Sequence, residues 1–200
     1  ATYGSLRLLL QFLPDASYYF SPLVQTLGVM SVIYASLVTL RQTDFKVLVA
    51  YSSVGHMGIV VLGLFSNSIQ GVEGSIILSI AHGLVSPALF MLVGAVLYDR
   101  FHTRTIRYYR GLVNYMPLFS VFFFLFTIAN AGVPMTGNWI GEVLCMMGAY
   151  QMNPIAATLT ASGIVLSAAY SIWLFNRITF GTYSNYLNYT TDMNRREFNV

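Results

Sequence analysis

The sequence LFTIANAGVPMTGNWIGE, residues 125–142, lies within an apolar region of 40 residues that extends from Leu112 to Gln151. A single continuous helix of that length would measure about 60 Å, roughly twice the hydrocarbon thickness of a bilayer. Pro134 removes a backbone donor, and Gly132 and Gly137 permit backbone angles that other residues avoid. We therefore expect one membrane crossing whose helix is interrupted at these three residues. The alternative is an ordinary loop between two separate crossings.

The composition of the whole chain supports a membrane location. Of its 200 residues, 56% are apolar and only 8% are Asp, Glu, Lys or Arg. A soluble domain carries about 25% charged residues, so this chain has too few to cover a globule with a hydrated surface. We therefore expect most of the surface to face lipid. The basic residues form no aromatic-interleaved patch, and we expect no nucleic acid partner.

Further apolar runs of about 20 residues predict spanning helices on both sides of the interrupted region. They are Pro22–Leu40, Val47–Phe65, Val72–Tyr98 and Ile155–Phe180, with Pro22 and Pro154 at helix starts. The run Ala1–Leu13 is too short to cross alone, and we interpret it as a helix that lacks its start. The sequence thus predicts an all-α, polytopic transmembrane helical bundle over residues 1–181. A polar segment over residues 182–200 follows, and we interpret the chain as part of a longer or split protein.

The distribution of charge between the spans tests this topology. If the interrupted region is one crossing, Asp15 and Glu73 lie on a side without Lys or Arg, and only Arg7, inside the first helix, is left over. The other side then receives the remaining basic residues, namely Arg41, Lys46, Arg100, Arg104, Arg107, Arg110, Arg177, Arg195 and Arg196. The positive-inside rule makes that side the cytoplasm or the mitochondrial matrix. An extra crossing would scatter the basic residues over both sides.

Three ionisable residues fall well inside the predicted spans: His56, His82 and Glu142. A charge at mid-membrane costs about 2.5–3.5 kcal/mol even on the lenient insertion scale, so such residues must face protein or internal water. Function is the default hypothesis for them. Lys46 stands at the start of a span, where many lysines only extend their ammonium group to the interface, and we assign it a supporting role.

The surroundings of each ionisable residue fit proton transfer. His56 follows the hydroxyl-bearing residues Tyr51, Ser52 and Ser53, which could hold a chain of internal water, and imidazole can accept and donate a proton near neutral pH. Pro87 has no N–H to bond to the carbonyl of Gly83, so this carbonyl is left as a further polar group beside His82. Glu142 comes five residues after the interruption, near the positive end of a new half-helix. The alternative for both histidines is a neutral side chain that only packs between helices.

Signatures of other chemistries do not occur in the sequence. There is no P-loop, dinucleotide fingerprint, haem motif or metal-ligand spacing. The single cysteine, Cys145, excludes a disulfide within the chain and any cysteine-built metal or iron–sulfur site. We therefore expect no metal, no bound cofactor and no redox centre in this chain.

Several blocks at these same residues resemble the subunit 4 family of proton-translocating NADH:quinone oxidoreductase, respiratory complex I. The blocks are Gln42–Lys46, Ala50–Met57, Ala81–Ser86, Tyr98–Arg104, Asn130–Pro134 and Gly141–Glu142. The likeness runs from Ala1 to about Gly181. Gly55, Pro87 and Trp139 stand where the family more often has Ser, Ser and Phe.

The resemblance implies an antiporter-like subunit of the membrane arm, with a discontinuous helix and a central line of protonatable residues. His56 and His82 match the central-axis histidines of the family, and Glu142 matches the glutamate of its second broken helix. The implied function is proton translocation coupled to NADH:ubiquinone oxidoreduction, with NADH, FMN, iron–sulfur clusters and ubiquinone held by other subunits. The implied location is the mitochondrial inner membrane or, as the alternative, the bacterial plasma membrane.

The implied partners are lipids and other membrane-arm subunits, including a chain or segment that carries the N-terminal half of the family domain. Two other functions remain open at this point. A stand-alone cation/proton antiporter subunit would share the fold but lack redox partners. An inert membrane scaffold would retain the fold without working proton sites, which the three mid-membrane ionisable residues argue against.

Overall fold

The protein is mostly helical in the part of the chain that its computed structural model describes, which is residues 2–184, 186–187 and 191–198. Within those residues the only extended pairing is an isolated bridge between Asp44 and Thr105. The first helical segments are α1 (Thr2–Gly4), η1 (Ser5–Leu9), α2 (Leu10–Phe12), α3 (Pro14–Leu40), α4 (Phe45–Leu64), α5 (Ile69–Met91), η2 (Leu92–Tyr98) and α6 (Asp99–Phe101). They are followed by η3 (Ile106–Tyr108), η4 (Leu112–Asn114), α7 (Pro117–Asn130), α8 (Gly137–Met152), α9 (Pro154–Thr179) and α10 (Arg195–Phe198).

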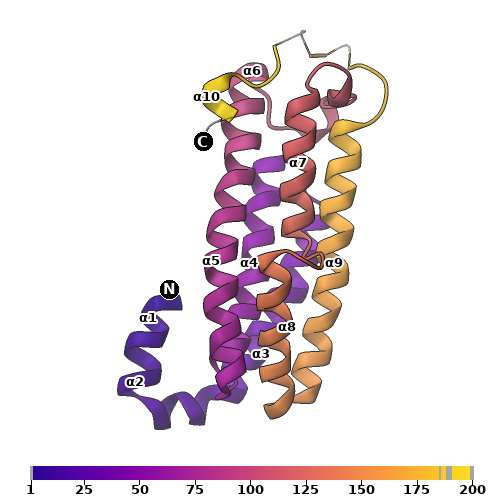
Figure 1. Ribbon diagram of the computed structural model, residues 1–200. Coiled ribbons are helices and arrows are strands. Elements are labelled where there is room, and N and C mark those ends of the chain that lie inside the picture. Colours follow the sequence, from indigo (N-terminus) through magenta and orange to yellow (C-terminus); the bar gives the residue numbers. More distant parts are fainter. Residues whose placement is uncertain (1, 185, 188–190, 199–200) are drawn as a thin grey trace.

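Four helices in the described residues are long and apolar enough to cross a membrane: Pro14–Leu40, Phe45–Leu64, Ile69–Phe101 and Pro154–Thr179. The third combines α5, the π-helical segment η2 and α6 into one rod. These helices stand side by side in an elongated bundle (Figure 1). The predicted all-α membrane bundle is therefore confirmed.

The interrupted helix of the bundle is formed by α7 and α8. They contain 14 and 16 residues, which correspond to about 21 and 24 Å, so neither crosses about 30 Å of hydrocarbon alone. Figure 1 shows α8 continuing beyond the end of α7 in the same direction. Together they make one crossing, which confirms the predicted interruption and excludes an ordinary loop between two crossings.

The end of α7 is set by local hydrogen bonding around Gly132. This glycine has a φ of +67°, and its N–H donates to the carbonyl of Ala129 at 3.3 Å while that of Val133 donates to Ile128 at 3.4 Å. This pair of bonds is the Schellman motif, in which glycine takes the left-handed position after a helix. Pro134 then prevents the helix from resuming at once.

The N-terminal boundary of α3 differs from the sequence prediction. The helix begins at Pro14, and Pro22 lies inside it rather than at its start, so that prediction was wrong. The turn around the internal proline is held from outside the helix, because Ser21 and Gln25 donate side-chain hydrogen bonds to the carbonyl of Phe65, at 3.1 and 3.2 Å. Pro154 does open α9, as predicted.

The first residues form three short helical segments rather than one helix. α1, η1 and α2 cover Thr2–Phe12, and Leu13 leaves the helical region with φ −129° and ψ 56° before Pro14 starts α3. Figure 1 shows these segments beside the lower part of the bundle and outside its main row of helices.

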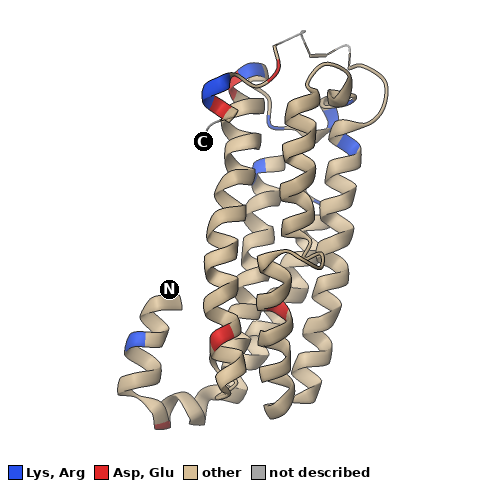
Figure 2. Cartoon of the chain, in the orientation of Figure 1, with Lys and Arg blue, Asp and Glu red and all other residues tan. Residues whose placement is uncertain are grey.

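The basic residues gather at one end of the bundle, where the segment between α6 and α7 and the C-terminal segment lie (Figure 2). The opposite end carries acidic residues, and one basic residue lies on the N-terminal segment. This arrangement confirms the predicted distribution of charge. Which compartment the basic end faces remains a prediction from the positive-inside rule.

The segment between α6 and α7, at the basic end, has a fixed and partly buried conformation. Tyr109 is 0% exposed within it, and its hydroxyl donates to the carbonyl of Thr103 at 2.8 Å. Burial raises the pKa of Tyr109 to about 12, so this hydroxyl remains a donor at physiological pH. The N–H of Ile106 donates to the carbonyl of Thr43 at 2.9 Å, which ties the segment to the start of α4.

Candidate functional site

Three helices bring the predicted ionisable residues together at the centre of the bundle. His56 from α4, His82 from α5 and Glu142 from α8 are 2%, 8% and 1% exposed. Nδ1 of His56 lies 3.0 Å from Oε1 of Glu142, as an ion pair or hydrogen bond. The rings of His56 and His82 are 5.5 Å apart between centroids. The three side chains therefore form one cluster, the His–His–Glu cluster, although 86 residues separate its first and last members.

The close approach of α8 to α5 places Glu142 in this cluster. A Cβ atom on Gly141 would lie only 2.6 to 2.7 Å from Leu78 atoms, including its backbone N and Cα. No side chain fits there, so glycine lets the two backbones meet in the manner typical of membrane helix pairs. Glu142, the next residue, is thereby turned toward α4 and His56.

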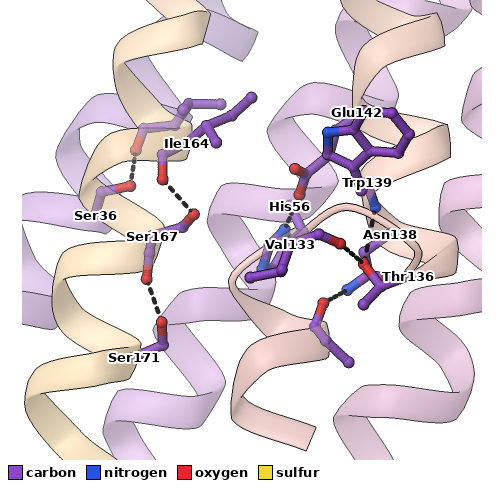
Figure 3. Close-up of polar contacts among 12 residues, drawn as sticks. Ser36, His56, Val133, Thr136, Asn138, Trp139, Glu142, Ile164, Ser167 and Ser171 are labelled. Atoms are coloured by element: carbon purple, nitrogen blue, oxygen red, sulfur yellow. Dashed lines mark hydrogen bonds and ion pairs between the residues drawn. The ribbon is translucent and has the colours of Figure 1, made fainter. Parts of the chain in front are cut away.

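The interruption between α7 and α8 forms one wall of the cluster. A Cβ atom on Gly132 would clash with Oε2 of Glu142 and lie 3.2 Å from its Cδ. Asn138 is 1% exposed, and its side-chain amide donates to the carbonyl of Ala129 at 3.0 Å, across the interruption. Thr136 caps α8 by accepting from the N–H of Trp139 at 3.4 Å. Figure 3 shows the Glu142 carboxylate and the His56 ring pointing toward each other beside this turn.

Some buried polar atoms of the cluster make no hydrogen bond within the described part of the protein. In the cluster and the wall beside it, four buried atoms have no hydrogen-bond partner among the described residues: Nε2 of His56, Nε2 of His82, Oε2 of Glu142 and Oδ1 of Asn138. Buried polar atoms are normally paired with protein or water. Each member of the cluster can therefore exchange a proton with a further group besides its neighbour in the cluster.

The predicted supporting hydroxyls separate into two groups. Ser53 lies 3.3 Å from Ser86 of α5, oxygen to oxygen, and Ser52 is 3% exposed and interacts with the side chain of Tyr170 on α9. Tyr51, by contrast, is 40% exposed and turns away from them. Two of the three predicted hydroxyls therefore face the interior of the bundle.

Lys46 lies apart from the cluster. Its Nζ is 4.1 Å from the centroid of the Tyr98 ring, and its Cε would lie 3.5 Å from a Cβ atom on Gly94. Both neighbours belong to η2, so the lysine rests on the π-helical end of the α5 rod near the basic end. This position suits an ammonium group that reaches the interface, and Lys46 does not contact His56 or Glu142.

Other buried hydroxyls at the contact of α3 and α9 do not extend the cluster. Ser36 donates to the carbonyl of Val32 at 2.6 Å, and Ser167 and Ser171 donate to carbonyls of their own helix, Ile164 and Ser167, at 2.7 Å each. Figure 3 shows these serines apart from His56 and Glu142. Each of these serine hydroxyls donates its hydrogen bond to a carbonyl of its own helix, as serine commonly does within helices.

Sequence reasoning missed Tyr170, Asn138 and Ser86 as members of the site. Tyr170 is 2% exposed and belongs to α9, which lies far from His56 along the chain. Only Asn138 carried a local signal, because it follows Gly137 directly at the start of a half-helix. Among the described residues, no group of three or more His, Cys, Asp or Glu side chains has an arrangement that could hold a metal ion.

Comparisons with known proteins show the family to which this chain is similar. A family model described as "NADH:quinone oxidoreductase/Mrp antiporter, TM" matches residues 1–167. NADH-ubiquinone oxidoreductase chain 4 of Mycosarcoma maydis is 72% identical over 198 residues, which are 99% of this chain and 41% of that protein. The protein of the same name from Marchantia polymorpha is 53% identical over 197 residues, which are 98% of this chain and 40% of that protein.

Solved structures show the same fold. A chain of respiratory complex I from Thermus thermophilus with bound NADH superimposes with a TM-score of 0.92 and 30% identity, covering 99% of this chain and 42% of that one. A chain of the Mrp complex from Dietzia sp. DQ12-45-1b gives a TM-score of 0.83 at 21% identity, covering 93% and 35%. This chain thus spans about two fifths of the length of these relatives. The matching family model covers most of its residues, and the chain belongs to the NADH:quinone oxidoreductase/Mrp antiporter transmembrane family.

Proposed function

We propose that this chain carries protons across the inner mitochondrial membrane as a membrane-arm subunit of respiratory complex I. The observation that carries the proposal is the His–His–Glu cluster: a 3.0 Å contact between His56 and Glu142, with the His82 ring 5.5 Å from that of His56. The named relatives, NADH-ubiquinone oxidoreductase chains 4 of eukaryotes, support the assignment to complex I.

The spacing of the cluster supports strong coupling between its charges. At 5.5 Å between ring centroids and an effective dielectric constant of about 20, two positive charges repel by about 3 kcal/mol. Both histidines therefore resist being charged together, and a proton on one favours its departure from the other.

The proton step follows from this coupling. When His82 takes up a proton, repulsion disfavours the charged form of His56. The proton on Nδ1 of His56 then transfers to Oε1 of Glu142 along the existing 3.0 Å contact, which leaves both groups neutral. Oε2 of Glu142 accepts no hydrogen bond from any described residue, so rotation of the neutral carboxyl group turns the protonated oxygen from His56 to that open side, where the proton passes to the next acceptor.

The surface of this chain supports additional membrane partners. The irregular backbone between α7 and α8 includes Met135, which is 97% exposed and has a φ of +79°. Gly137, beside this turn, approaches Ala81 in the middle of α5, so the turn lies at membrane depth. Irregular backbone facing lipid there is not tolerated, and we infer that another segment or subunit covers it.

The redox reaction belongs to other subunits in this proposal. NADH, FMN, iron–sulfur clusters and ubiquinone would be bound by them, and this chain would contribute proton transfer alone. The second candidate, a stand-alone cation/proton antiporter subunit, has the same fold in its favour, as the Mrp chain shows. Purification from native membranes separates the two, because only the complex I subunit would co-purify with redox subunits.

The test of the proposal is the exchange Glu142→Gln, which keeps the shape of the side chain but cannot titrate. In the assembled complex, reconstituted into vesicles, we expect both NADH:quinone activity and membrane potential to fall. Glu142→Asp should retain part of each, because a shorter carboxylate can still take up a proton. Glu73 is an exposed residue of α5, and the exchange Glu73→Gln is the matched control that should leave both unchanged. A Glu142→Gln complex that assembles on native gels and pumps like the parent would exclude Glu142 as a proton site.

A further inference from the structure

A polar cavity of about 570 Å³ lies at the basic end of the bundle, outside the His–His–Glu cluster. Its lining residues carry two arginines and several hydroxyls but no carboxylate, and they are Arg107, Tyr108, Arg110, Thr182, Tyr183, Ser184 and Tyr186. The first three belong to the segment between α6 and α7, and the others follow α9. Figure 1 shows these two segments meeting at the same end of the molecule.

The walls of this cavity are held together by contacts between the two segments. The N–H of Gly111 donates to the carbonyl of Phe180 at 3.2 Å, and the Ser184 hydroxyl donates to the carbonyl of Tyr108 at 2.6 Å. The Tyr108 and Tyr186 rings are 5.4 Å apart between centroids. The cavity is therefore a built feature of the fold and not a gap between independent loops.

The structure shows no ion pair for either of the two cavity arginines, Arg107 and Arg110, among the described residues. Arg100, by contrast, pairs with Glu197 at 2.7 Å. Arg104, likewise, stacks over an aromatic ring at 4.9 Å. Two exposed guanidinium groups facing one cavity repel each other and favour an anion between them. Arginine presents a planar fork that matches the oxygens of phosphate.

We propose that this cavity binds a phosphate group, presented by the headgroup of an acidic phospholipid in the leaflet at the basic end. The depth fits a headgroup, because α9 ends at Thr179, three residues before the first cavity residue of that segment. Basic pockets at helix ends on the matrix or cytoplasmic side are suited to acidic lipid headgroups. The Ser184 and Tyr183 hydroxyls already donate to protein carbonyls, so further donors to phosphate oxygens come from other lining hydroxyls, such as those of Tyr108 and Thr182.

The experiment uses the assembled, delipidated membrane complex and a photoreactive phosphatidylglycerol analogue. Binding is measured as the label recovered in peptides that line the cavity, as a function of analogue concentration. The double variant Arg107→Gln/Arg110→Gln should bind about thirtyfold more weakly, from about fivefold for each arginine near a lipid surface. The control Arg195→Gln/Arg196→Gln removes the same charge from the same end but lies outside the cavity, and it should bind like the parent.

Further arms distinguish the sources of phosphate and guard against failed assembly. Equal labelling of the two double variants would overturn the proposal. So would protection of the cavity by inorganic phosphate without any labelling by the lipid analogue, or cross-linking to an acidic protein segment instead of lipid. If the glutamine variant does not assemble, the variant Arg107→Lys/Arg110→Lys takes its place. It keeps both positive charges but lacks the planar guanidinium groups that bind two phosphate oxygens at once. It should label less than the parent, and parental labelling would refute the site.

Discussion

The exchange Gly132→Ala tests how the interruption between α7 and α8 controls the His–His–Glu cluster. An alanine at φ +67° costs about 1–2 kcal/mol, because its Cβ crowds the next carbonyl in the left-handed region. The same Cβ would clash with Oε2 of Glu142, so the carboxylate must move away. We expect the 3.0 Å contact to His56 to be lost, although no titratable group has been changed.

The expected result is a fall in the rate of proton pumping by about tenfold or more, since misplacement of a reacting group by about 1 Å can slow a reaction by that much. Pumping would be measured in reconstituted vesicles with a pH-sensitive dye. Gly83→Ala is the matched control on α5, where a Cβ meets no atom within 4 Å, and it should pump like the parent. The double variant Gly132→Ala/Glu142→Asp should recover part of the activity, because the shorter side chain makes room for the methyl group.

Parental pumping by an assembled Gly132→Ala complex would refute this reasoning. So would equal losses in Gly132→Ala and Gly83→Ala, because the effect would then come from glycine replacement in general. A stability change without a pumping change would mean that the turn supports the fold but does not position the carboxylate.

Three further predictions follow from the charge pattern. A cysteine at Thr105 should react with a membrane-impermeant reagent from the matrix side of sealed membranes, and labelling from the other side only would overturn the orientation. His82→Asn should lower pumping while native gels show intact assembly, because the neutral side chain removes the repulsion that displaces the proton from His56. Unchanged pumping would mean that His82 only packs between helices. Arg100 holds the pKa of Glu197 below its ordinary value, so docking of α10, worth at most about 1 kcal/mol, should persist above pH 4.5 and weaken as the pH falls through the lowered pKa. Hydrogen exchange of residues 195–198 would show it, and Glu197→Gln should abolish that acid dependence.

Much of the fold was predictable because the membrane limits the choices. Spans of apolar residues, the count of crossings and the interruption at Gly132 all follow from helix length, bilayer thickness and backbone chemistry. The position of Pro22 was not predictable in the same way. Proline at a helix start is the local preference, but tertiary hydrogen bonds from Ser21 and Gln25 to Phe65 hold the turn around it within α3.

The candidate site was predictable in its members but not in its arrangement. Burial cost alone selected His56, His82 and Glu142. Their contact depends on α8 meeting α5 at Gly141, a packing choice that sequence spacing within one helix does not contain. The same limit explains why Tyr170 was missed, since its partner Ser52 lies on another helix.

The central claim is that His56 and Glu142 act as one proton-transferring unit. A double-mutant cycle in reconstituted complexes tests it, with His56→Gln, Glu142→Gln and the double variant compared by the rate of proton pumping. If the two residues act as a unit, the double variant should pump no worse than the more damaged single variant, because the step is already lost. If instead the two losses multiply, the residues act independently, and the account of a shared proton across their 3.0 Å contact is contradicted.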